Sequence, residues 1–108
     1  MPFTQINYAL HSQTWALAAS AAGEAVVSPV GLGVASVQVT GSFGGATVVL
    51  EVSNDGTNWV TLTDRTGAEI SLTAAGFRDI TSGAQYVRAR AVGGSGTSVT
   101  VRLVAWGN

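Results

Sequence analysis

The segment Gly41–Leu62, GSFGGATVVLEVSNDGTNWVTL, constrains the fold of this chain more than any other. Within it, Ala46–Ser53 alternates between an apolar and a more polar set, which is typical of a strand with one buried face. The Gly-Gly pair at 44–45 and the Asn-Asp-Gly at 54–56 are turn signals, because these residues tolerate positive φ or hydrogen-bond their own backbone. The segment therefore predicts strand, turn, strand, turn, and a further strand that begins at Trp59.

A strand is also expected over Val34–Phe43, just before the first of these turns. A hairpin through 44–45 would place Val39 opposite Leu50 on the apolar face and Gln38 opposite Glu51 on the polar face. A slip of one residue would turn one of the two apolar sets toward solvent. The pattern therefore favours this hairpin and this register.

Short strands separated by turn signals continue to the end of the chain, about every eight to twelve residues. Glu24–Val30 contains Pro29, which indicates an edge strand because proline donates no ladder hydrogen bond. Gln85–Val92 and Val99–Trp106 are expected to form a final hairpin around the glycine-rich turn at 93–96. The whole pattern predicts an all-β fold, a single antiparallel β-sandwich of jelly-roll or immunoglobulin-like type.

The N-terminal residues 1–13 allow two interpretations. Phe3, Ile6 and Tyr8 alternate with polar neighbours, as in a strand. They form either a first strand packed on the chain's own sheet or an arm that completes a neighbour's sheet. The chain is therefore divided into an N-terminal arm or first strand at 1–13 and one β-sandwich domain at 14–108.

Composition excludes several classes of function. The net charge is −1 and only 10% of the residues are charged, so the basic surplus of a nucleic-acid or anionic-membrane binder is absent. The chain has no cysteine, which rules out disulfides and thiolate chemistry. Neither a signal-peptide pattern nor an apolar run of membrane-spanning length occurs, so we expect synthesis and folding in a cytosol.

The sequence also shows no pattern typical of an active site. His11 is the only histidine, and no G-x-S-x-G element accompanies it, so it is expected to be an ordinary polar residue or one with its hydrogen bonds satisfied. The turn at 54–56 lacks the further spaced acids of a calcium loop, and one histidine without cysteine makes no zinc site. We therefore predict a protein that is not an enzyme and holds no cofactor and no metal.

The expected last hairpin carries the residues most suited to binding a partner. Tyr86, Arg88 and Arg90 alternate with an apolar set, and the hairpin would bring Arg88 near Arg102, with Trp106 on the same outward face. Tyrosine, tryptophan and arginine are enriched at binding hot spots. The other interpretation is a solvated face on which arginine stems cover apolar surface.

Trp59 follows the turn at 54–56 and has two interpretations as well. It is either a core anchor or a platform on which a ligand stacks. We favour the core anchor, because strands use large aromatic side chains for packing.

At GSFGGATVVLEVSNDGTNW the chain resembles a group of small tailed-bacteriophage virion proteins. The matching segments are Gly41–Thr47, Ser53–Trp59, the turn at 64–67 and Tyr86-Val87-Arg88. The resemblance implies a β-sandwich subunit of the virion, made in the host cytoplasm, that decorates or cements the capsid. Its implied partners are the major capsid protein or other virion proteins, with many copies of the chain forming a homo-oligomer on the particle. A neck, tail or head-fibre subunit is the alternative within the same group.

Ser53–Trp59 also resembles the strand-turn-strand of discoidin-like carbohydrate-binding domains. This second resemblance implies a glycan stacked on Trp59 or Trp106, with Asn58 or Asp55 bonding its hydroxyl groups. Neither resemblance implies nucleic acid or membrane as a partner. The residues expected to contact a partner are Phe3, Ile6, Tyr8, Tyr86, Arg88, Arg90, Arg102 and Trp106.

Overall fold

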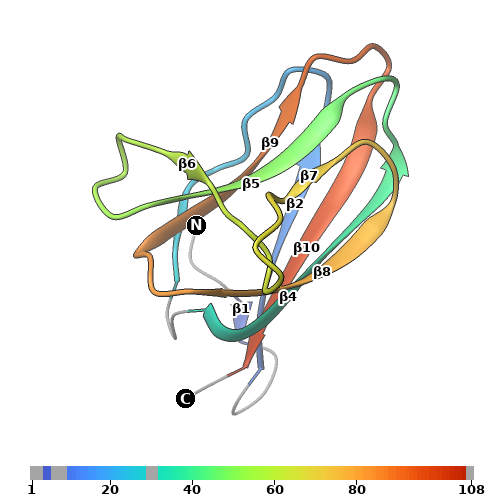
Figure 1. Ribbon diagram of the computed structural model, residues 1–108. Coiled ribbons are helices and arrows are strands. Elements are labelled where there is room, and N and C mark those ends of the chain that lie inside the picture. The colour runs from blue at the N-terminus through green and yellow to red at the C-terminus, as the bar shows by residue number, and fades with distance from the viewer. Residues whose placement is uncertain (1–3, 6–9, 29–31, 107–108) are drawn as a thin grey trace.

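The computed structural model describes residues 4–5, 10–28 and 32–106, which form two antiparallel sheets packed face to face (Figure 1). The first sheet has the order β1 (Thr4–Gln5), β2 (Leu10–Leu17), β10 (Ser98–Trp106), β4 (Leu32–Ser42), β8 (Gly76–Ser82). The second sheet has the order β3 (Val26–Val27), β9 (Tyr86–Val92), β5 (Thr47–Ser53), β6 (Val60–Thr61), with β7 (Ser71–Leu72) also paired to β5. The predicted all-β antiparallel sandwich is confirmed. The described residues contain no helix that could span a membrane.

The strand order distinguishes between the two sandwich types that the sequence left open. Leaving aside β1, and with β6 and β7 sharing the position beside β5, the sheets read 2-10-4-8 and 3-9-5-6. Apart from β5 and β6, neighbouring strands in these orders are not consecutive in the chain, and most connections cross from one sheet to the other. This is the double Greek-key arrangement of a jelly roll.

Both hairpins predicted around glycine-rich turns are wrong. β4 pairs with β10 and β8, so Val39 lies opposite Val101 rather than Leu50, which itself pairs with Ala89 on β9. β9 and β10 likewise lie in different sheets. The alternation of apolar and polar residues identified the inward side chains of β4 and β5 correctly, because each strand buries its apolar set in the core between the sheets. It could not show whether the turn joins strands within a sheet or crosses between sheets.

The same topology separates the two arginines that the hairpin was expected to bring together. Arg88 on β9 lies opposite Glu51 on β5, in the second sheet. Arg102 on β10 lies opposite Gln38 on β4, in the first sheet. The two side chains therefore occupy opposite outer faces of the sandwich, and the predicted pairs Arg88–Arg102 and Gln38–Glu51 do not form.

The turn that connects β4 to β5 and the turn that connects β9 to β10 both cross from one sheet to the other, and they contact each other at one end of the sandwich. The amide of Ser95 donates to the carbonyl oxygen of Gly44 at 2.9 Å, and the Thr97 hydroxyl donates to the Phe43 carbonyl oxygen at 2.7 Å. Gly44 has a φ of 58°, and a Cβ there would collide with the Ser95 carbonyl oxygen. Glycine is therefore required at this position both for backbone conformation and for close approach.

The core lies between the sheets and is built from the inward set of each strand, with Leu50, Ile80 and Leu103 almost completely buried. The central strand β5 differs from the expectation of a half-buried strand, because its outward residues are covered as well. Glu51, on that outward side, is only 6% exposed. The side chains of Arg88 and Arg90, on the neighbouring strand β9, lie against it.

The N-terminal part joins the same sandwich. β1 pairs with β2, and β2 pairs along its length with β10. β2 begins at Leu10 and ends at Leu17, so it runs across the boundary placed between residues 13 and 14. β3 is the edge strand predicted near Pro29, although Pro29 itself lies outside the described residues.

Candidate functional site

The outer face of the second sheet carries an ionic cluster, which we call the arginine face: Glu51, Trp59, Tyr86, Arg88 and Arg90. Strand alternation places the last three side chains in one row on β9, as the sequence predicted. The antiparallel register sets Glu51 of β5 directly opposite Arg88. The row therefore faces a single acidic residue on the central strand.

One carboxylate holds both guanidinium groups of this face. Arg88 Nε donates to Glu51 Oε1 at 2.9 Å. Arg90 binds through two nitrogens, Nε to Oε1 at 3.2 Å and Nη2 to Oε2 at 3.0 Å. Charge-assisted bonds of this kind are stronger than neutral ones and fix the planes of the groups. The cluster has one positive charge left over and a fixed geometry.

Trp59 belongs to this outer face and not to the core. The guanidinium carbon of Arg88 lies 4.2 Å from the centroid of its ring, a cation–π contact. The predicted core anchor is wrong, because Trp59 is only half-buried and is not among the residues of the core, while its ring contacts an arginine of the outer face. Arg88 therefore covers one face of the Trp59 ring.

The Glu51 carboxylate is ionised under ordinary conditions. Burial by itself raises its pKa, but the hydrogen bonds and positive charges of Arg90 and Arg88 outweigh burial and hold the pKa below its ordinary value. The group is therefore the anionic centre of the cluster rather than a proton donor. The side chains of Arg88 and Arg90 are 25% and 39% exposed, so Arg90 presents more surface to a partner.

From the sequence, Glu51 is expected only opposite Gln38, and its contact with the two arginines is not predicted. A signal was present, because Glu51 is the only charged residue in its strand. Pairing it with Arg88 and Arg90, however, requires the order of strands in the sheet.

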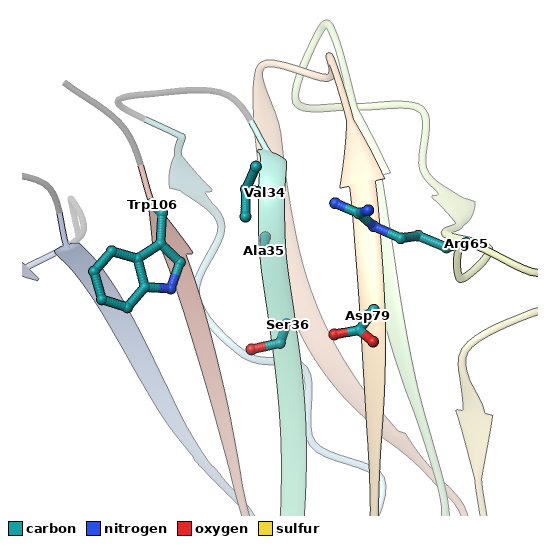
Figure 2. Close-up of a pocket in the computed structure, with 6 residues that line it drawn as sticks. All are labelled: Val34, Ala35, Ser36, Arg65, Asp79 and Trp106. Carbon is teal, nitrogen blue, oxygen red and sulfur yellow. The ribbon is translucent and has the colours of Figure 1, made fainter.

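A second feature lies on the outer face of the first sheet, a shallow groove of about 280 Å³ that we call the Trp106 groove (Figure 2). It is lined by Val34, Ala35, Ser36, Arg65, Asp79 and Trp106. The register places Trp106 opposite Val34 across β10 and β4, and Ser36 opposite Asp79 across β4 and β8. Apolar groups thus occupy one side of the groove and polar groups the other.

The turn at 64–67 contributes Arg65 to the polar wall of the Trp106 groove. The Arg65 amide donates to the Asp79 carbonyl oxygen at 3.0 Å, which attaches the turn to the edge strand β8. Inside the turn, Asp64 Oδ1 accepts hydrogen bonds from the Thr66 amide and hydroxyl and from the Ala68 amide. These bonds hold the pKa of Asp64 below its ordinary value.

The partner-binding residues predicted from the sequence are thus divided by the fold. Tyr86, Arg88 and Arg90 share the arginine face. Arg102 and Trp106 lie on the opposite outer face, so the single face expected for all five is wrong. Phe3, Ile6 and Tyr8 lie outside the described residues.

The turn at 54–56 is closed by its own side chains. Asp55 Oδ1 accepts from the amides of Thr57 and Asn58, each at 2.8 Å, and from the Ser53 hydroxyl. Asp55 Oδ2 accepts from the Asn58 side-chain amide at 2.7 Å. Asp55 and Asn58 are therefore bonded to each other, and the predicted turn is confirmed.

We expect Asp55→Ala to loosen this turn without unfolding the sandwich, because the lost bonds are local and exposed. Hydrogen exchange at the Thr57 and Asn58 amides should accelerate, measured by NMR. The bonds from Asn58 and Thr57 hold the pKa of Asp55 well below its ordinary value. In the wild type, these two amides should therefore stay protected from hydrogen exchange in acid, until the pH falls through that lowered pKa. Unchanged exchange in the variant would contradict the bonding scheme.

The described residues contain no group of three or more side chains that suits a metal ion. His11 faces inward at the end of β2, where it pairs with Ala105 and is only 8% exposed. Its Nε2 has no hydrogen-bond partner within the described chain. The ordinary polar residue expected from the sequence is thus a buried one.

Comparison with known proteins adds one structural relative. No family model and no curated protein matches the sequence. The fold is similar to the crystal structure of SPBc2 prophage-derived protein YomS, with a TM-score of 0.73 and 20% sequence identity. The match covers 95% of this chain and 98% of that one, so the two share a fold over most of their length.

Proposed function

We propose that this chain is a structural protein of a bacteriophage particle, which binds the outside of the head as a decoration or cement subunit. The observation that carries the proposal is the likeness, over most of the chain, to a prophage-derived protein. The resemblance of Gly41–Trp59 and its neighbours to small virion proteins supports the same role. So does the jelly roll, an architecture found among viral capsid domains.

The proposed mechanism is adhesive. Many copies would each bridge neighbouring subunits of the major capsid protein or other virion proteins, and repeated contacts would add through avidity. A standard interface buries about 1,600 Å² in total, which a sheet face of this domain can supply. This role needs no catalytic group, cofactor, nucleic acid or membrane.

The arginine face is the proposed contact surface. Glu51 already fixes Arg88 and Arg90, so binding a partner would restrict these side chains little further. Tyr86 and Trp59 add aromatic area beside them, a combination typical of hot spots. The partially exposed Arg90 would meet a carboxylate or a carbonyl group of the partner.

The test compares the two outer faces on particles that lack the protein. Wild-type protein and Arg102→Ala should restore equal occupancy, since Arg102 lies on the far face. A Tyr86→Ala/Arg90→Ala variant should bind about tenfold more weakly, as truncation of hot-spot residues does. Occupancy is measured by cosedimentation, with thermal unfolding to show that each variant is folded.

Equal binding of both variants would rule out the arginine face as the contact. Reconstruction of the wild-type particle by cryo-electron microscopy gives the location directly. Density on the icosahedral lattice supports decoration of the head. Density only at the neck or tail would make the chain a connector or tail subunit, and its absence from the particle would overturn the proposal.

A further inference from the structure

We propose that the Trp106 groove binds one pyranose ring of a glycan. This site lies on the face opposite the proposed capsid contact, so it goes beyond the adhesive role and does not depend on it. The proposal commits to a sugar because the groove combines an open aromatic face with hydroxyl-binding groups.

The aromatic wall is open to solvent. Trp106 is 51% exposed although it stands within a regular strand, and Val34 opposite it is 58% exposed. An indole beside an aliphatic side chain is a firm apolar surface with few rotatable bonds. The C–H face of a pyranose ring is the part of a sugar that packs on such a surface.

The opposite wall supplies hydrogen-bonding groups. Asp79 is exposed and offers two acceptor oxygens, while Ser36 can both donate and accept. Arg65 extends from the neighbouring turn above Asp79 and places a positive charge at this wall (Figure 2). The two oxygens of a carboxylate can accept hydrogen bonds from two adjacent hydroxyl groups of a sugar.

The two walls match the amphipathic character of a sugar ring. Trp106 and Asp79 lie on opposite sides of β4, so a ring spanning the strand would meet both (Figure 2). The volume, about 280 Å³, is near the lower limit for small-molecule pockets, which suits a single ring. One acidic and one basic side chain leave no net charge, which favours a neutral sugar.

The site is also held rigid before any ligand arrives. Trp106, Ser36 and Asp79 stand on paired strands of the first sheet. Arg65 belongs to the turn tied to β8 by the bond to the Asp79 carbonyl oxygen. A preformed site loses little freedom on binding. By contrast, Trp59 on the arginine face is only half exposed and has Arg88 over one face of its ring.

Three tryptophans in different surroundings make the test direct. With 5-fluorotryptophan incorporated, ¹⁹F NMR gives separate signals for buried Trp15, half-buried Trp59 and exposed Trp106. The probes are methyl glycosides of glucose, galactose, mannose, rhamnose and N-acetylglucosamine, titrated into the purified protein. We expect at least one of them to shift the Trp106 signal saturably while the other two signals stay in place.

Substitutions then test whether each wall of the groove contributes to binding of the glycoside. Asp79→Asn should weaken binding of the active glycoside by about tenfold, and Trp106→Ala should abolish it. The matched control Trp59→Phe should bind as wild type does. No saturable shift of Trp106 with any glycoside would overturn the proposal, as would a shift confined to Trp59 or a response unchanged in Asp79→Asn. These results are independent of whether the protein occupies a capsid.

Discussion

Gly44→Ala is expected to lower the free energy of unfolding by about 3 kcal/mol, from two sources. The φ of 58° lies in the left-handed region, where a side chain is disfavoured by roughly 1–2 kcal/mol. The new Cβ would also collide with the carbonyl oxygen of Ser95, a backbone atom in the other sheet-crossing turn. Relieving the collision would pull apart the bond between the Ser95 amide and the Gly44 carbonyl oxygen.

Gly45→Ala is the matched control for this prediction. Gly45 has a φ of 84°, but nothing lies within 4 Å of a Cβ built there. It should therefore cost only the conformational part, about 1 kcal/mol. Urea unfolding of both variants measures the difference. If the two costs agree within about 0.5 kcal/mol, the contact between the two crossing turns is contradicted, and the 44–45 turn would behave as the free tip of a hairpin.

That comparison also tests what the sequence could not decide. Alternation of side chains predicts which residues face the core, because a strand has a period of two wherever it is placed. The inward positions of β4 and β5 were therefore predictable. Whether 44–45 joins them within a sheet or across the core was not, since both arrangements bury the same side chains and both tolerate glycine.

The candidate sites could likewise be predicted only where they depend on the alternation within one strand. The row Tyr86, Arg88 and Arg90 needs only the period of one strand, and it was predicted. The partner Glu51 and the outward turn of Trp59 depend on strand order and on the short pairing of β6 with β5. The Trp106 groove draws Asp79 and Arg65 to Trp106 from distant parts of the chain. Only the jelly-roll topology brings those residues together.

The second large effect is expected at Glu51, where Glu51→Gln should cost about 2 kcal/mol of stability at neutral pH. The substitution keeps the shape of the side chain but removes the charge that both Arg88 and Arg90 bind. Loss of one member of a fully buried ion pair costs more, roughly 3–5 kcal/mol. Here both arginines reach solvent, which reduces the loss. Glu69→Gln, at an exposed position, should stay within about 0.5 kcal/mol of wild type.

The pH dependence separates this ionic role from mere packing. The folded-state pKa of Glu51 lies below its ordinary value of 4.5, so the stabilising contribution is fully present above that value. It is lost as the pH falls through the lower, folded-state pKa, where the carboxylate takes up a proton. The stability gap between wild type and Glu51→Gln should therefore be constant near neutrality and narrow in acid. A gap that stays the same in acid would mean that Glu51 acts through its shape, and the arginine face would lose its anionic centre.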